Sequence, residues 1–291
     1  MIEIEPAKCQ ATIWTMNNSQ GVKHYENFPV ASFLCPPALR PAIVAIYWFA
    51  RTADDIADEG DATPAQRLAD LKDYRADLAA CAAGEITTGR WSNVFTPLAR
   101  VIQQYALPVD LLAHLLSAFE QDVVKTRYTS QAELLDYCRR SANPVGRLLL
   151  HLYEVNDAQS LEQSDCICTA LQLVNFWQDL GVDILRGRIY LPADGWARLG
   201  VDEAQLLRLE VNPPTTALVA ANVAWAKTLM QRGAPLAKKV PGRAGWELRM
   251  VVQGGLRIAE KIEQMDFASL QQRPKINAWD GLIMLWRAVR M

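Results

Sequence analysis

The chain lacks the features that mark membrane-spanning and exported proteins. Its 291 residues contain no run of about 18 uncharged apolar residues, so no segment is predicted to cross a membrane. The first residues, MIEIEPAKCQ, are acidic and lack the basic and then apolar layout of a signal peptide. We therefore expect a cytoplasmic protein.

A surplus of charge of either sign is also missing. The 30 basic and 32 acidic residues leave a net charge of −2. Without a basic surplus there is no general positive field for nucleic acid, so we expect no nucleic-acid partner. An anionic ligand would have to be bound locally, by a few side chains.

Several motifs of metal and cofactor chemistry are absent as well. The six cysteines form no zinc-type CxxC pair and lie mostly in apolar helical patterns, which indicates buried thiols in a reducing compartment. No Gly-rich dinucleotide fingerprint follows a predicted strand. The sequence therefore gives no sign of NADPH, and a reductive reaction is disfavoured.

What remains is a helical pattern around a large core. The chain is 51% hydrophobic and 21% charged, enough apolar material for a globular domain. We find no steady period-two alternation and no long repeat, so we predict one all-α domain over residues 1–291, with about ten helices and a flexible N-terminal segment at 1–23. The residues 186–201 contain turn signals and are predicted to form a loop. The predicted helices cover residues 39–57, 65–83, 94–105, 111–125, 131–142, 145–154, 165–185, 215–232, 246–265 and the last part of the chain.

One predicted helix carries a polar stripe inside an apolar segment. In the stretch AIYWFARTADDIAD, four polar residues return to one face of a helix that turns about 100° per residue, within an arc of roughly 60°. These residues are Tyr47, Arg51, Asp54 and Asp58. Buried carboxylates are costly unless something positive lies between them, so the stripe needs a partner.

A second stretch, LQLVNFWQDLGVD, repeats the arrangement. Gln172, Asn175, Asp179 and Asp183 fall within an arc of about 80° on one helical face. Carboxylate oxygens suit Mg²⁺, which commonly bridges a protein to substrate phosphates. Two facing helices of this kind could clamp a diphosphate through magnesium ions. The structural alternative is that each acid pair is solvated or salt-bridged. This alternative is less favoured when two such stripes occur in one chain.

Basic and aromatic side chains accompany both stripes. Arg51 lies one turn before Asp54, and Arg186, Arg188 and Tyr190 follow Asp183. Guanidinium groups offer paired donors to an anion, although Arg51 could equally form an ion pair within its own helix. The nine tryptophans, among them Trp48 and Trp177, are candidates for stabilising a cation, but aromatics at helical spacing are more often core residues.

The two stretches AIYWFARTADDIAD and LQLVNFWQDLGVDILRGRIYLP resemble the aspartate-rich motifs of the head-to-head prenyl synthases, the squalene and phytoene synthase family. The resemblance extends from HYENFPVAS to the RPKINAWD tail. Within the family, ENFPVAS and FARTADDIADEGD are most similar to bacterial hydroxysqualene synthases of hopanoid biosynthesis. The family resemblance implies an isoprenoid synthase fold around a central cavity that binds Mg²⁺ and a prenyl diphosphate.

Residue roles follow from the resemblance position by position. It implies metal ligands at Asp54, Asp58, Asn175, Asp179 and Asp183, and of these the four aspartates are expected to be catalytic. Further positions are expected to bind the substrate, namely His24, Asn27, Tyr47, Arg51, Gln172, Gln178, Arg188 and Tyr190. From its spacing alone, His24 would more often be a capping or surface residue.

The chain also departs from the family pattern. Gln178 stands where many members have arginine, and Val182 replaces a common acid. A member that only ionises a preformed diphosphate could tolerate both changes. The resemblance therefore favours Mg²⁺-dependent conversion of presqualene diphosphate and water to hydroxysqualene and diphosphate.

Two other functions remain open from the sequence. One is the condensation of two farnesyl diphosphates to presqualene diphosphate or dehydrosqualene. The other is a non-catalytic assembly or lipid-binding relative, which would be expected to lose the acids that this chain keeps. The favoured reaction implies functional coupling to a presqualene diphosphate synthase.

The last predicted helix, DGLIMLWRAVR, mixes apolar and basic residues. Such a helix could make peripheral contact with the inner face of the cell membrane, or could pack on the body of the domain.

Overall fold

Helices account for the regular structure of the chain. The structure is a computed structural model, and it describes residues 35–85 and 89–291. Within these ranges the chain forms fourteen α-helices and no strand, apart from an isolated bridge between Arg127 and Ile189. The all-α prediction is confirmed. No helix in the described ranges is both long and apolar enough to cross a membrane.

The first seven helices run from the first acidic stripe to the start of the second. They are α1 (Arg40–Asp58), α2 (Pro64–Ala82), α3 (Ser92–Tyr105), α4 (Val109–Asp122), α5 (Gln131–Ser141), α6 (Asn143–Leu152) and α7 (Ala158–Gln178). The remaining helices are α8 (Leu180–Leu185), α9 (Ala193–Leu199), α10 (Glu203–Leu207), α11 (Pro213–Gly233), α12 (Leu236–Lys239), α13 (Gly242–Gln264) and α14 (Ala278–Arg290).

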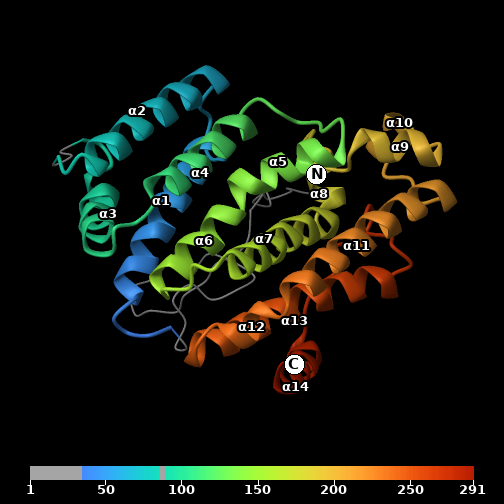
Figure 1. The fold of residues 1–291 in the computed structure, drawn as a ribbon. Coiled ribbons are helices and arrows are strands. Elements are labelled where there is room, and N and C mark those ends of the chain that lie inside the picture. Colours follow the sequence, from blue (N-terminus) through green and yellow to red (C-terminus); the bar gives the residue numbers. More distant parts are fainter. Residues whose placement is uncertain (1–34, 86–88) are drawn as a thin grey trace.

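Helix α7 lies in the middle of the molecule, with α1–α4 to one side and α11–α13 to the other (Figure 1). One buried cluster joins α1–α4, and within it the rings of Phe49, Tyr74 and Phe95 connect α1, α2 and α3 with centroids 4.7–6.0 Å apart. Two further clusters pack α7 against α11 and α13. Because apolar packing surrounds both acidic stretches, their helices are held rigidly by the rest of the chain.

The helix that carries the second acidic stretch differs from the prediction at both of its ends. A single helix over 165–185 was expected, but α7 begins at Ala158, where the Asp157 side chain accepts a hydrogen bond from the Ser160 N–H. Ser160 and Ser164 fill buried positions of these first turns. An apolar periodicity cannot detect small polar residues used in this way.

The helix also breaks at Asp179, and α8 starts directly after it. The break lets the backbone of the 269–270 segment lie against Gly181, where a Cβ atom would stand 2.4 Å from the Leu270 carbonyl oxygen. Only glycine tolerates this approach. The contact brings the neighbouring Arg273 to the acidic stretch.

The predicted loop over 186–201 is wrong in part, because it contains α9. Pro192 precedes this helix, and the buried Trp196 donates a hydrogen bond from its indole Nε1 to the Leu191 carbonyl at 3.0 Å. Pro192 and Gly200, two of the residues that suggested a loop, mark the ends of a short helix instead. Short helices such as α9, α10 and α12 explain why the structure has more helices than predicted.

Helix α14 is fixed to α13 by a buried carboxylate. Asp280 accepts hydrogen bonds from Lys261 and Arg257, each at 2.7 Å, and also caps its own helix with Asn277. Burial would raise the pKa of Asp280, but the hydrogen bonds from Lys261, Asn277 and Arg257 hold it at about 2. The alternative that the last helix packs on the body of the domain is therefore confirmed for the face of α14 that carries Asp280.

Replacement of Asp280 should destabilise the protein in a pH-dependent manner. Because its folded pKa is depressed from about 4 to about 2, ionised Asp280 contributes about 2 kcal/mol above pH 4, and this is lost as the pH falls toward 2. We expect urea unfolding at pH 7 to show a deficit of that size for Asp280→Asn, shrinking below pH 4. The control Glu162→Gln breaks an exposed pair with Arg232 and should change stability by less than about 0.5 kcal/mol. An equal deficit at pH 7 and pH 2.5 would contradict the assignment.

Candidate active site

The two acidic stretches meet in one small pocket. Its volume is about 40 Å³. The lining side chains come from α1, α4, α5, α7 and α8 and from the segment after α8. They are Asp54, Ala57, Asp58, Asp122, Tyr137, Gln172, Asn175, Phe176, Asp179, Asp183, Arg188 and Tyr190. All five predicted metal ligands are among them, and so are Gln172, Arg188 and Tyr190 of the predicted substrate-binding residues.

Arginines neutralise two of the carboxylates. Arg188 donates to Asp58 at 2.6 Å and joins the segment after α8 to the end of α1. Arg273 binds both carboxylate oxygens of Asp179, with one of the two contacts at 3.2 Å. Guanidinium groups therefore lie where positive charge is required, beside carboxylates from each stripe.

Two other carboxylates lack full compensation. Burial raises the pKa of Asp54 to about 8, and the neighbouring Asp58 adds to the rise while Arg51 opposes it. Burial likewise raises the pKa of Asp122 to about 7, against the effects of the Tyr137 hydroxyl and Arg188. The pocket thus gathers more acid groups than its arginines can keep ionised, and a bound cation would stabilise their charged forms.

The donor set fits magnesium ions that are shared with a ligand. The pocket offers carboxylate and amide oxygens, the ligands that Mg²⁺ prefers. Among residues 35–85 and 89–291, no three acid, imidazole or thiol groups converge closely enough to hold one ion by themselves. Because Mg²⁺ usually takes one or two carboxylates together with waters and phosphate oxygens, the arrangement suits ions completed by a diphosphate.

Asp122 and Tyr137 belong to the site, although neither was among the residues predicted from the sequence. Asp122 ends α4, and its Oδ2 accepts a hydrogen bond from the Tyr137 hydroxyl at 2.9 Å. A signal was present, because Asp122 follows the buried Leu115 and Ala118 at helical spacing on the core face of α4. The C-terminal end of a helix disfavours negative charge, so an acid at that position on the core face indicates a functional role.

Aromatic rings form one wall of the pocket. Phe176 and Tyr190 both line it and stack with centroids 3.7 Å apart and an interplanar angle of 8°. Tyr128 lies behind Tyr190, stacked at 5.8 Å. The tryptophans considered from sequence lie elsewhere, since Trp177 is fully buried in the core and Trp48 is exposed.

Some predicted substrate-binding residues do not line the pocket. Gln178 is buried and donates from Nε2 to the Pro274 carbonyl at 2.8 Å, so it supports the 269–275 segment instead. Arg51 pairs with Asp55 at 2.6 Å and also with Asp54 and Glu59, and Tyr47 lies one turn before it. Tyr47 and Arg51 share a face of α1 with Asp54 and Asp58, but the rise of about 1.5 Å per residue places them nearer the start of the helix than the pocket.

His24 and Asn27 lie outside the described residues.

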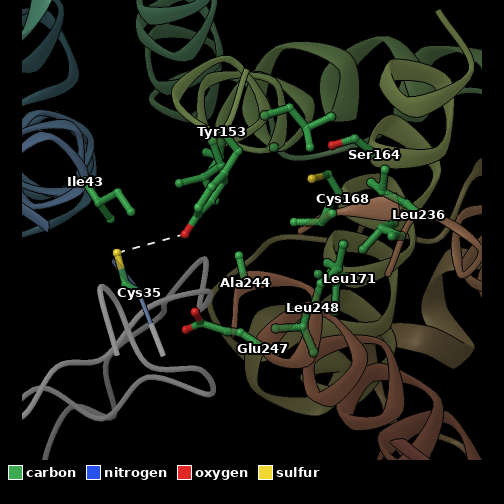
Figure 2. A pocket seen from close by; sticks show the side chains of 17 residues that line it. Cys35, Ile43, Tyr153, Ser164, Cys168, Leu171, Leu236, Ala244, Glu247 and Leu248 are labelled. Carbon is green, nitrogen blue, oxygen red and sulfur yellow. Dashed lines mark hydrogen bonds between the residues drawn. The ribbon is translucent and has the colours of Figure 1, made fainter. Parts of the chain in front are cut away.

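An apolar pocket of about 130 Å³ lies along the preceding turns of α7 (Figure 2). Helix α7 lines it with Ser164, Ile167, Cys168 and Leu171, immediately before the stretch that lines the acidic pocket. Other walls come from α1, α6, α12 and α13. Polar groups are few: the Tyr153 hydroxyl, 4.0 Å from the Cys35 sulfur, and the Glu247 carboxylate lie at one side (Figure 2). The fold therefore places a lipid-like environment beside an acidic one.

The chain is similar to members of one protein family. The family described as squalene/phytoene synthase matches residues 22–280. A hydroxysqualene synthase of Zymomonas mobilis is 36% identical over 248 residues, which cover 82% of this chain and 78% of the relative. A presqualene diphosphate synthase of Rhodopseudomonas palustris is 31% identical over 183 residues, covering 62% of this chain and 63% of the relative.

A solved structure shares the fold. The crystal structure of the squalene synthase HpnC from Alicyclobacillus acidocaldarius superposes with a TM-score of 0.78 at 34% identity, covering 84% of this chain and 90% of that one. The two acidic stretches, the pocket that they form and these matches agree, and the chain belongs to the squalene/phytoene synthase family.

Proposed function

We propose that the protein converts presqualene diphosphate and water into hydroxysqualene and diphosphate. The observation that carries the proposal is that one face of α7 lines two pockets in succession, one apolar and one acidic. A prenyl diphosphate has the same division into a charged head and a hydrocarbon chain. The similarity to hydroxysqualene synthases over most of the chain supports this choice of reaction.

The site would hold Mg²⁺ through oxygen ligands of the two stripes, namely Asp54, Asp58, Asn175, Asp179 and Asp183. When bound, Mg²⁺ would neutralise the diphosphate and make it a better leaving group. Arg188 and Arg273 already touch two of these aspartates, so they are within reach of the same anion. They would bind phosphate oxygens that metal leaves free.

The aromatic and apolar residues of the two pockets would stabilise and shield the cation that forms when the diphosphate departs. The stacked rings of Phe176 and Tyr190 present aromatic faces, which stabilise positive charge without reacting with it. The apolar pocket excludes water from the hydrocarbon chain. The cation is thereby confined until a water molecule captures it.

The charge of the site favours one diphosphate over two. The Gln178 amide donates a hydrogen bond to the Pro274 carbonyl and adds no positive charge to the site. Val182 adds no carboxylate that could bind a further metal ion. Condensation of two farnesyl diphosphates would bring twice the phosphate charge into the same region. A presqualene diphosphate synthase would then have to supply the substrate.

Substrate supply tests the assignment directly. With Mg²⁺, we expect the purified protein to release diphosphate and hydroxysqualene from presqualene diphosphate, as measured by mass spectrometry of the products. Chelation of the metal should abolish the reaction. Rapid turnover of farnesyl diphosphate alone, without a partner enzyme, would instead support the condensation reaction.

Neighbouring acids of α1 provide a matched pair of variants. Asp54 lines the acidic pocket, whereas Asp55 pairs with Arg51 and is not among the lining residues. We expect Asp54→Asn and Asp179→Asn to lower kcat/KM by at least about 100-fold because each removes a metal ligand. Asp55→Asn should stay within about threefold of the parent. If Asp54→Asn and Asp179→Asn left function intact, the non-catalytic alternative would be favoured.

We also propose that the outer face of α14 contacts the inner face of the cell membrane, where a C30 product must be delivered. This α14 outer face consists of five side chains that are 52–75% exposed: Trp279, Leu282, Leu285, Trp286 and Val289. The acid of this helix, Asp280, is buried on the opposite face, and Arg290 lies 4.1 Å from the Trp286 ring. An apolar face edged by positive charge suits an anionic lipid surface.

A second copy of the chain is a less suitable occupant. A helix of 13 residues offers a face of roughly 20 Å by 10 Å, well below the approximately 800 Å² per partner of a stable interface. A bilayer requires no matching surface and can accept the side chains individually. Contact with a cytoplasmic membrane surface is therefore the proposal, and self-association is the outcome that would replace it.

Flotation with vesicles distinguishes these outcomes. The full chain should float with phosphatidylglycerol-containing vesicles and less with purely zwitterionic ones. Leu282→Gln combined with Trp286→Gln should reduce flotation at least about tenfold, since each loses apolar area available to lipid. The control, Leu207→Gln with Val211→Gln, alters exposed apolar residues elsewhere and should float normally. Failure of the parent chain to float, or a stable dimer that the α14 variant abolishes, would contradict the proposal.

A further inference from the structure

We propose that Asp122 is a positioning residue that orients the Tyr137 hydroxyl to hold the water molecule that captures the cation. The inference rests on the proposed function and deepens it, because it assigns the step that turns a prenyl cation into an alcohol. It comes from two side chains that line the acidic pocket and that neither acidic stripe includes.

The contact between the two residues fixes the direction of one proton. The Tyr137 hydroxyl donates to Oδ2 of Asp122 at 2.9 Å. A phenol has a single O–H donor and lone pairs that accept. With its proton directed at Asp122, the Tyr137 oxygen can offer the pocket only an acceptor.

The surroundings leave the phenol little freedom. Tyr137 is buried, with the Tyr128 ring at 5.7 Å and the Phe176 ring at 6.2 Å. The end of α4 that carries Asp122 is tied to α5, because Arg140 donates to Gln121 at 2.6 Å. Donor and acceptor therefore come from two helices that are locked together, so the hydroxyl orientation is built into the scaffold.

An acceptor in this place would orient a water molecule for attack. Water that donates one O–H to the Tyr137 oxygen turns its own lone pairs away from the phenol, toward the pocket where the cation forms. Its oxygen then forms the new C–O bond with one lone pair. One O–H bond of the resulting oxonium breaks, and its proton passes to the diphosphate, which left with the electron pair of its C–O bond. Charge and atoms balance without another reactant.

Loss of this water would change the product more than the rate of ionisation. The cation would instead lose a proton to the diphosphate and give a dehydrosqualene-type hydrocarbon. The informative measurement is therefore the ratio of hydroxysqualene to hydrocarbon, together with the separately measured rate of diphosphate release. A general loss of structure would lower both products and leave their ratio unchanged.

Four variants test the assignment in the full chain with presqualene diphosphate and Mg²⁺. Tyr137→Phe removes the acceptor and Asp122→Leu removes its orientation, so each should lower the ratio at least about fivefold while diphosphate release continues. Asp122→Asn keeps a carbonyl oxygen for the phenol and should retain most of the parent ratio. Tyr128→Phe deletes a neighbouring buried hydroxyl that does not line the pocket, and should leave the ratio unchanged.

The outcomes separate this inference from the proposed function. If the parent protein makes no hydroxysqualene from presqualene diphosphate, the proposed function fails. If the parent makes it but Tyr137→Phe keeps the same product ratio, only the water-holding role fails. A ratio for Asp122→Asn as low as that for Asp122→Leu would show that the carboxylate charge is needed, and would overturn positioning through the phenol.

Discussion

Repulsion among carboxylates in one small pocket is the constraint on which the rest of the structure depends. Asp54 and Asp58 from α1 approach Asp122 from α4, and the pKa values of Asp54 and Asp122 are raised as a result of burial and of this proximity. Such a cluster opposes folding. It persists because apolar packing on both sides of the pocket fixes the helices that carry it.

The arginines of the pocket relieve part of this repulsion. Arg188 and Arg273 come from segments outside the main helices, yet each reaches one acidic stripe. The Arg273 contact depends on Gly181, which lets the 269–270 backbone approach α8, and on Gln178, which binds the Pro274 carbonyl. A residue expected to face the substrate thus supports the segment that supplies a positive charge to the site.

The same helices that gather charge also separate it from hydrocarbon. Along α7, four residues between positions 164 and 171 line the apolar pocket, and Gln172, Asn175 and Phe176 line the acidic one. A rise of about 1.5 Å per residue places the two environments within one substrate length of each other. This arrangement suits chemistry in which a charged group leaves and a reactive hydrocarbon must be shielded from bulk water.

The sequence by itself determined the helical class, both acidic stripes and the pocket residues within them, because helical periodicity and charge are local properties of a chain. Asp54, Asp58, Asn175, Asp179 and Asp183 could be found in this way. The two motifs also indicated Gln172, Arg188 and Tyr190. The tertiary structure alone decided which side chains from outside the two motifs join the site.

Asp122, Tyr137 and Arg273 lie on separate segments, and only packing brings them to the pocket. Gln178 turns away because the helix breaks after it and the 269–275 segment takes its amide. Contacts of this kind, including that of Arg188 with Asp58, join residues up to 130 positions apart, and no spacing rule within one helix encodes them.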